Sequence, residues 1–237
     1  MYHEYKNTKV NYKVIGNGMT AIVFLHGWGG NIKSFEFIVN CLCFDYKAVL
    51  IDFPPFGESE TPNSDFTIFD YEKLVIEIMN KENITSPIIV GHSFGGRVAI
   101  LLASSGNCKK LILTASAGLK PKRSIKYKFK IVKKKIYNKL GLKYNCGSAD
   151  YNALPKNMKK TFVNIVTTYL EKYAININVP TILFWGKKDK DTPFYMAKRL
   201  QRLIKDSEII AFKNSGHFCY IDNLKSFIAV INFFATN

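Results

Sequence analysis

The chain of 237 residues is 47% hydrophobic and 22% charged, a balance that predicts an ordinary globular protein with a sizeable buried core. No stretch approaches the roughly 18 apolar residues of a membrane span, and the N-terminal segment has no apolar run of signal-peptide length. We therefore expect a cytoplasmic protein with no integral membrane segment. Five cysteines without C-x-x-C or zinc-ligand spacing argue against a disulfide framework and against a metal site.

The formal net charge of +16 owes much to the lysine-rich segment 120–143. We interpret this segment as a solvated face of the protein. The alternative is an anionic partner that carries a phosphate, a carboxylate or a lipid headgroup. We expect no nucleic-acid partner, because the sequence contains no visible recognition module for nucleic acid.

Short apolar runs rich in β-branched residues recur along the chain and predict the buried strands of a parallel sheet. They lie at residues 21–25, 47–51, 87–91, 110–115, 180–185 and 208–212. Segments with helical spacing lie between and after them, at residues 31–42, 67–82, 94–106, 193–204 and 222–236. Asp65 or Thr67 is the expected cap of the second helix. Strands that alternate with helices predict an α/β fold, with a mostly parallel central sheet and helices on both faces.

Residues 118–178 interrupt this alternation. They contain no convincing buried strand, and helical patterns appear at residues 126–140 and 158–173. Because long loops without secondary structure are uncommon, we expect this insertion to form a helical cap, or lid, over the carboxyl ends of the strands. The predicted core then consists of residues 1–117 and 179–237.

The segment VGHSFGG, residues 90–96, places Ser93 between an expected strand and an expected helix. Gly91 and Gly95 leave room for a sharp turn that would expose the Ser93 hydroxyl at the top of the sheet, next to a helix N-terminus. This arrangement is typical of a nucleophilic serine. A plain connection between strand and helix is the alternative.

A serine hydroxyl needs a nearby base, and histidine suits this role at neutral pH. The chain has four histidines. His3 lies near the N-terminus, His26 follows the first apolar run, and the side chain of His92, beside Ser93, should point elsewhere. His217, in the loop after the last predicted strand, is therefore the expected base.

The base in turn needs a carboxylate, which we expect at the end of a strand between the nucleophile and the base. The run 110–115 is followed by no acidic residue before Asp150. The run 180–185 is followed by Asp189 and Asp191. We predict that Asp189 is the acid and that Asp191 caps the helix that begins near Pro193, with the reverse assignment as the alternative.

Attack on a carbonyl also requires donors for the developing oxyanion. The backbone N–H of Phe94, directly after Ser93, is one expected donor. The backbone N–H of Trp28 in the segment HGWGG is the other, because Gly27 and its neighbours make this loop flexible. We expect His26 to orient this loop through hydrogen bonds and to take no part in the chemistry.

The motifs FLHGWGG, DFPPFGES, VGHSFGG, FWGKKDKDTP and SGHF, in this order, resemble those of the α/β-hydrolase superfamily, and in particular of its small capped members. The order Ser93, Asp189, His217 is also the order of nucleophile, acid and base in that superfamily. One motif departs from the pattern, because Pro55 stands where relatives commonly have glycine; we expect a stiffer loop near the pocket.

The resemblance implies a serine hydrolase that cleaves a carboxylic ester or a thioester of a small molecule through an acyl-enzyme, without cofactor or metal. A serine nucleophile argues against dehalogenases and epoxide hydrolases, which resemble this fold but use aspartate. Three alternatives remain within the fold: a carbon–carbon bond hydrolase, a lactonase, and a non-catalytic protein that binds a small ligand and signals through a partner. The lysine-rich segment adds an anionic acyl group or a phosphorylated carrier as a further hypothesis for the substrate.

Overall fold

The computed structural model describes residues 1–122, 137 and 149–237. Most of the lysine-rich segment, and the helix expected over residues 126–140 apart from Tyr137, lie outside this part of the chain. Within the described residues, no helix has the length and apolar character needed to cross a membrane.

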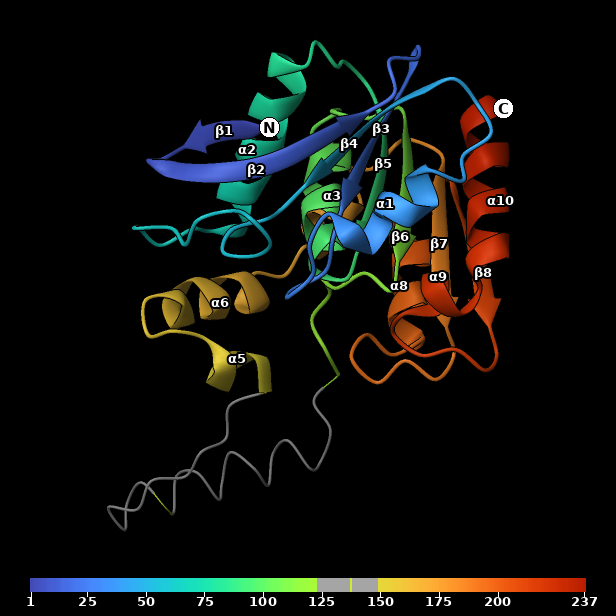
Figure 1. Cartoon of the computed structure of the whole chain (residues 1–237). Coiled ribbons are helices and arrows are strands. Elements are labelled where there is room, and N and C mark those ends of the chain that lie inside the picture. The colour runs from blue at the N-terminus through green and yellow to red at the C-terminus, as the bar shows by residue number, and fades with distance from the viewer. Residues whose placement is uncertain (123–136, 138–148) are drawn as a thin grey trace.

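The fold is built on an eight-stranded sheet in the order β1-β2-β4-β3-β5-β6-β7-β8 (Figure 1). Strands β3 to β8 run parallel to one another, whereas β2 is antiparallel to both of its neighbours, β1 and β4. The predicted α/β architecture with a mostly parallel sheet is confirmed. The strands are β1 Tyr2–Tyr5, β2 Thr8–Ile15, β3 Thr20–Leu25, β4 Tyr46–Ile51, β5 Ile88–His92, β6 Lys110–Thr114, β7 Thr181–Gly186 and β8 Ser207–Phe212.

Two hydrophobic layers cover the faces of this sheet, as the alternation of side chains along each strand requires. In β3, Val23 and Leu25 belong to one layer, and Ile22 and Phe24 belong to the other. The first layer is packed by helices α2 Ile68–Lys81, α3 Phe94–Ser104 and α8 Tyr195–Leu203. The second layer is packed by helices α1 Lys33–Val39, α9 Cys219–Asp222 and α10 Leu224–Thr236.

The start of α2 settles the choice between the two expected caps. Thr67 is the N-cap, and its backbone N–H donates a hydrogen bond of 2.7 Å to Oδ2 of Asp70. The Thr67 hydroxyl donates to the same oxygen at 2.7 Å. Asp65 instead pairs with Lys160 of the insertion. Helix α2 therefore begins at Ile68, one residue after the start of the predicted range 67–82.

The insertion between β6 and β7 contains the helices α5 Ala149–Ala153, α6 Met158–Thr167 and α7 Glu171–Ala174. The continuous helix expected over residues 158–173 is wrong, because the chain leaves the helix at Thr168 and turns before α7. Helices α5 and α6 lie beyond the end of the sheet at which β8 terminates (Figure 1). Helix α7 packs against α3, next to the sheet.

Candidate active site

Ser93 lies on a sharp turn between β5 and α3, with a positive φ of 49°. Its backbone N–H donates to the carbonyl of Thr114 at 3.2 Å, and the N–H of Gly95 donates to the carbonyl of His26 at 3.0 Å. A Cβ atom on Gly95 would lie 2.0 Å from the carbonyl oxygen of Leu25, and one on Gly91 would lie 2.7 Å from that of Gly95. Both glycines are therefore required by close backbone contacts, which hold a non-glycine residue in a conformation that is costly elsewhere.

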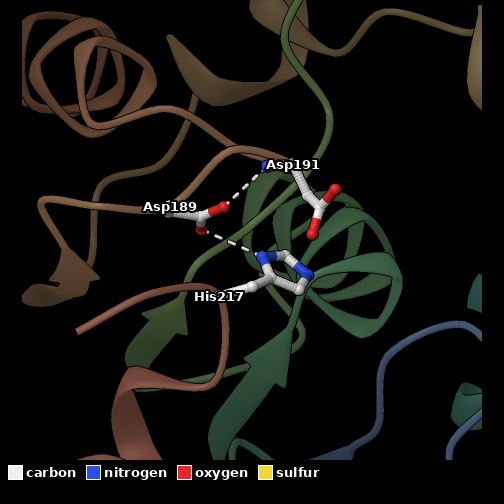
Figure 2. A group of neighbouring side chains, drawn as sticks. All are labelled: Asp189, Asp191 and His217. Atoms are coloured by element: carbon white, nitrogen blue, oxygen red, sulfur yellow. Dashed lines mark hydrogen bonds and ion pairs between the residues drawn. The ribbon is translucent and has the colours of Figure 1, made fainter.

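Asp189 and His217 meet at the same end of the sheet, from the loops that follow β7 and β8 (Figure 2). The Nδ1–H of His217 donates to Oδ2 of Asp189 at 2.9 Å. Asp189 is buried and also accepts hydrogen bonds from the backbone N–H groups of Asp191 and Thr192 and from the Thr192 hydroxyl. Burial alone would raise the pKa of Asp189, but the hydrogen bonds from His217 and Thr192 outweigh it and hold this pKa below its usual value. Asp189 is therefore ionised at neutral pH.

Asp191 lies close to this pair without capping a helix. Helix α8 begins at Tyr195, with Phe194 as its N-cap residue, so the predicted capping role of Asp191 is wrong. The carboxylate of Asp191 is exposed, and it lies beside the imidazole ring of His217 in Figure 2. One carboxylate oxygen each of Asp189 and Asp191 and one ring nitrogen of His217 lie within 4.8 Å of one another. The Asp191 carboxylate therefore adds negative charge next to the imidazole.

Ser93 and His217 line one small pocket of about 180 Å³, which we call the serine pocket. Trp28 and the adjoining glycines, Gly27, Gly29 and Gly30, form another wall of it. The structure places no direct hydrogen bond between the side chains of Ser93 and His217, an arrangement that is common before a substrate draws nucleophile and base together. The structure thus brings the expected nucleophile, the expected base and the loop of the expected oxyanion donor Trp28 to a single pocket.

The two expected oxyanion donors, the N–H groups of Phe94 and Trp28, lie near Ser93 in the chain and in the serine pocket respectively. The N–H of Phe94 lies between those of Ser93 and Gly95, each of which has an acceptor. Among the described residues, no backbone acceptor is hydrogen-bonded to the N–H of Phe94 or to that of Trp28. Trp28 lines the serine pocket and Phe94 directly follows Ser93, so both groups stay the expected oxyanion donors.

His26 holds the loop that carries Trp28. Its Nε2 accepts a hydrogen bond of 2.8 Å from the N–H of Phe53, so Nδ1 carries the proton and donates to the carbonyl of Gly27 at 2.7 Å. Burial lowers the pKa of His26 to about 4, so the ring is neutral at physiological pH. These two hydrogen bonds tie the ring to the backbone at Gly27 and Phe53, and the orienting role expected from the sequence stays a prediction.

His92 has a place in the site that the sequence reasoning missed. Its Nε2 donates to the carbonyl oxygen of His217 at 3.1 Å, and the two rings lie 4.8 Å apart. Burial lowers the pKa of His92 to about 3, so it stays neutral. His92 therefore supports the backbone of the expected base. The only feature of the sequence that could have indicated this contact is that His92 is a polar residue at the end of an otherwise apolar strand.

A second pocket of about 320 Å³ adjoins the serine pocket and shares Trp28 and Gly29 with it. We call it the apolar pocket, because none of the lining residues that the structure describes is charged. Trp28, Pro55, Phe56 and Leu154 give it mainly hydrophobic walls. Pro55, the departure from the family motif, is one of the residues that line this pocket. The other lining residues are Gly29, Thr61, Ala153 and Pro155.

Comparison with known proteins finds a matching family, similar sequences and similar structures. Residues 20–140 match the family model described as alpha/beta hydrolase fold. The "AB hydrolase superfamily protein YisY" of Bacillus subtilis is 28% identical, over 94% of each chain. Among solved structures, an esterase from Exiguobacterium antarcticum superposes with a TM-score of 0.79 at 21% identity, covering 100% of this chain and 99% of its own. A meta-cleavage product hydrolase from Pseudomonas fluorescens IP01 superposes with a TM-score of 0.76 at 18% identity, covering 100% and 98%.

Proposed function

Because the chain belongs to the alpha/beta hydrolase family, we propose that it is a serine hydrolase that cleaves a carboxylic ester or thioester of a small molecule. One observation carries the proposal: Ser93, on a strained turn, shares the serine pocket with His217, whose Nδ1 is already bonded to the buried Asp189. This is the arrangement that activates a serine hydroxyl.

In the proposed mechanism, Nε2 of His217 removes the proton of the Ser93 hydroxyl as its oxygen attacks the carbonyl carbon of the substrate. The N–H groups of Trp28 and Phe94 stabilise the negative charge on the carbonyl oxygen. The bond to the alcohol or thiol then breaks, and the leaving group takes the proton from His217. A water molecule, deprotonated by His217, releases the acid from Ser93 and restores the enzyme.

Asp189 and Thr192 support this sequence of steps. The ionised Asp189 holds His217 in the tautomer that leaves Nε2 free to accept a proton, and stabilises the imidazolium that forms. The Thr192 hydroxyl donates to Oδ2 of Asp189 at 2.6 Å and keeps the carboxylate facing the histidine. Asp189 itself remains ionised throughout.

We assign residues 118–178 as the cap and the apolar pocket as the site of the acyl group. Leu154 and Pro155 of this segment line the pocket together with Trp28 and Phe56 of the core. A pocket of about 320 Å³ without a described charged side chain favours an uncharged, aliphatic or aromatic acyl group of modest size. It gives no support to the anionic acyl group suggested by the net charge.

The first test is turnover of a p-nitrophenyl ester by the wild-type protein and by Ser93→Ala. We expect release of p-nitrophenol by the wild type and a loss of roughly 10⁴-fold or more in Ser93→Ala, because the nucleophile is removed. A fluorophosphonate probe should label Ser93 in the folded protein. Ser105→Ala, at an exposed position on the far end of α3, is the matched control and should keep full activity.

The same experiment, extended to thioester and lactone substrates, separates the proposed function from its alternatives. A protein that turns over no ester, thioester or lactone and is not labelled by the probe, yet binds a small ligand, would be the non-catalytic alternative. Labelling of Ser93 without ester turnover would point to a carbon–carbon bond hydrolase, because the activated serine would then act on another bond.

A further inference from the structure

Arg97 is a buried cation that the proposed chemistry does not use. It lies four residues after Ser93 on α3, about one helical turn from the nucleophile, and is 7% exposed. No carboxylate of the described residues forms an ion pair with it. Burial lowers the pKa of Arg97 to about 10, so its guanidinium is still positively charged at neutral pH. The charge of Glu171 favours this cation, but a buried charge that forms no ion pair also needs hydrogen-bond acceptors.

The carboxyl end of α6 supplies these acceptors. One guanidinium nitrogen of Arg97, Nη1, donates to the carbonyl oxygens of Ile165 at 3.0 Å and Thr168 at 2.8 Å, and Nη2 approaches the carbonyl oxygen of Val166 at 3.5 Å. The last carbonyls of a helix have no partner within the helix and carry the negative end of its dipole. Arg97 of the core therefore caps a helix of the insertion.

The same helix forms part of the active-site surroundings. The ring of Phe162 lies 5.0 Å from that of Trp28, centroid to centroid. The Thr161 hydroxyl accepts a hydrogen bond of 3.1 Å from the N–H of Phe66, two residues before α2. Phe162 lies about one helical turn before Val166, so a shift at the capped end of α6 displaces the contact with Trp28. Trp28 is shared by both pockets.

We propose that Arg97 is a positioning residue for the hydrolysis proposed above, because its guanidinium fixes α6 against α3 and thereby sets the shape of the apolar pocket. The inference rests on the proposed function. Ser93 and Arg97 lie on consecutive turns of the same chain segment, so the nucleophile and the anchor of α6 are held in one rigid element. The acyl chain of the substrate then meets a pocket whose distance from Ser93 is fixed.

The test compares Arg97→Met and Arg97→Lys with the wild type on p-nitrophenyl acetate and p-nitrophenyl octanoate. Arg97→Met keeps the bulk of the side chain but removes its donors, so kcat/KM should fall about 10-fold or more for the octanoate and much less for the acetate. Arg97→Lys keeps the charge but lacks the planar guanidinium, so its ratio of kcat/KM on the octanoate to kcat/KM on the acetate should lie between those of the wild type and Arg97→Met. Arg202→Met, at an exposed position of α8, is the matched control.

Each outcome has one meaning. A ratio of octanoate to acetate that is unchanged in Arg97→Met, or an equal loss on both esters, would show that Arg97 only stabilises the fold and would overturn the inference. If Arg97→Met does not fold, Arg97→Lys decides the question. The inference then requires that the ratio of kcat/KM on the octanoate to kcat/KM on the acetate falls in Arg97→Lys. It also requires that amide hydrogen exchange becomes faster in α6 but not in β5. A wild type that cleaves neither ester and resists the fluorophosphonate would refute the proposed function itself.

Discussion

At the scale of single residues, the site is assembled by contacts to backbone as much as by side chains that a sequence pattern can reveal. The meeting of Asp189 and His217 could be predicted, because few histidines and acidic residues stand at the right strand ends. Their catalytic roles remain predictions. The hydrogen bonds of His92 and Arg97 could not be predicted, because their acceptors are carbonyl groups of His217 and Thr168, and a backbone acceptor leaves no residue pattern.

The first prediction at the residue scale is that Asp189, and not Asp191, is the catalytic acid. In Asp189→Asn, the side-chain amide can donate to His217 and stabilise the wrong tautomer, so we expect kcat/KM to fall by about 10⁴-fold. The fold should survive, because an amide oxygen can still accept the N–H groups of Asp191 and Thr192. Steady-state kinetics with a p-nitrophenyl ester measure the effect.

Asp191→Asn is the matched control, since it removes the second carboxylate near His217 and leaves Asp189 in place. We expect it to lower kcat/KM by less than about 10-fold, as an electrostatic contact in an exposed position is weak. A loss of about 10⁴-fold in Asp191→Asn with an active Asp189→Asn would reverse the assignment of the acid.

At the scale of elements, the apolar runs located the six parallel strands to within a residue or two, because strands buried on both faces must be continuously apolar. The β1–β2 hairpin was not predicted. In β2, Val10 and Tyr12 are buried while Lys9 and Lys13 are exposed, so its signal is alternation rather than a run. The break between α6 and α7 was missed because Arg97, far away in the sequence, caps the end of α6.

The turn of this hairpin allows a prediction about stability. Lys6 and Asn7 have positive φ values of 48° and 55°, the conformation of a type I′ turn, for which glycine is preferred at the second position. Asn7→Gly should therefore raise the free energy of unfolding by about 0.5–1 kcal/mol, and Asn7→Ala should lower it by a similar amount. Urea denaturation of the three proteins measures both changes. A loss of stability in Asn7→Gly would contradict this account of the turn.

At the scale of the whole molecule, two buried layers cover a mostly parallel sheet that is flanked by helices in Figure 1. The loops after β7 and β8 carry Asp189 and His217 at one end of this sheet. Alternation of strands and helices was enough to predict this arrangement. The net charge of +16 gave no guide to the pocket, because the pocket residues that the structure describes are uncharged. Charge is a property of the whole surface, whereas specificity depends on the few side chains that face the substrate.

The buried histidines make the stability of the whole molecule dependent on pH. The pKa of His26 falls from 6.5 to about 4 and that of His92 to about 3, in both cases because burial disfavours the charged ring. In the unfolded chain, each would bind a proton below about pH 6.5. The unfolded state therefore binds up to two more protons than the folded state between pH 6.5 and 4, and stability must decline as the pH falls through this window.

We expect the free energy of unfolding to decrease with a limiting slope of about 1.4 kcal/mol per pH unit for each of the two histidines. Asp70 and Asp189, whose pKa values are lowered by hydrogen bonds against the effect of burial, add to the decline only at lower pH, where they become protonated. Urea denaturation at intervals from pH 7.5 to 5 measures the slope. His92→Asn should roughly halve it, since one proton-binding difference is removed. A stability that stays constant below pH 6.5, or a slope that His92→Asn leaves unchanged, would show that these rings do not stay neutral in the folded protein.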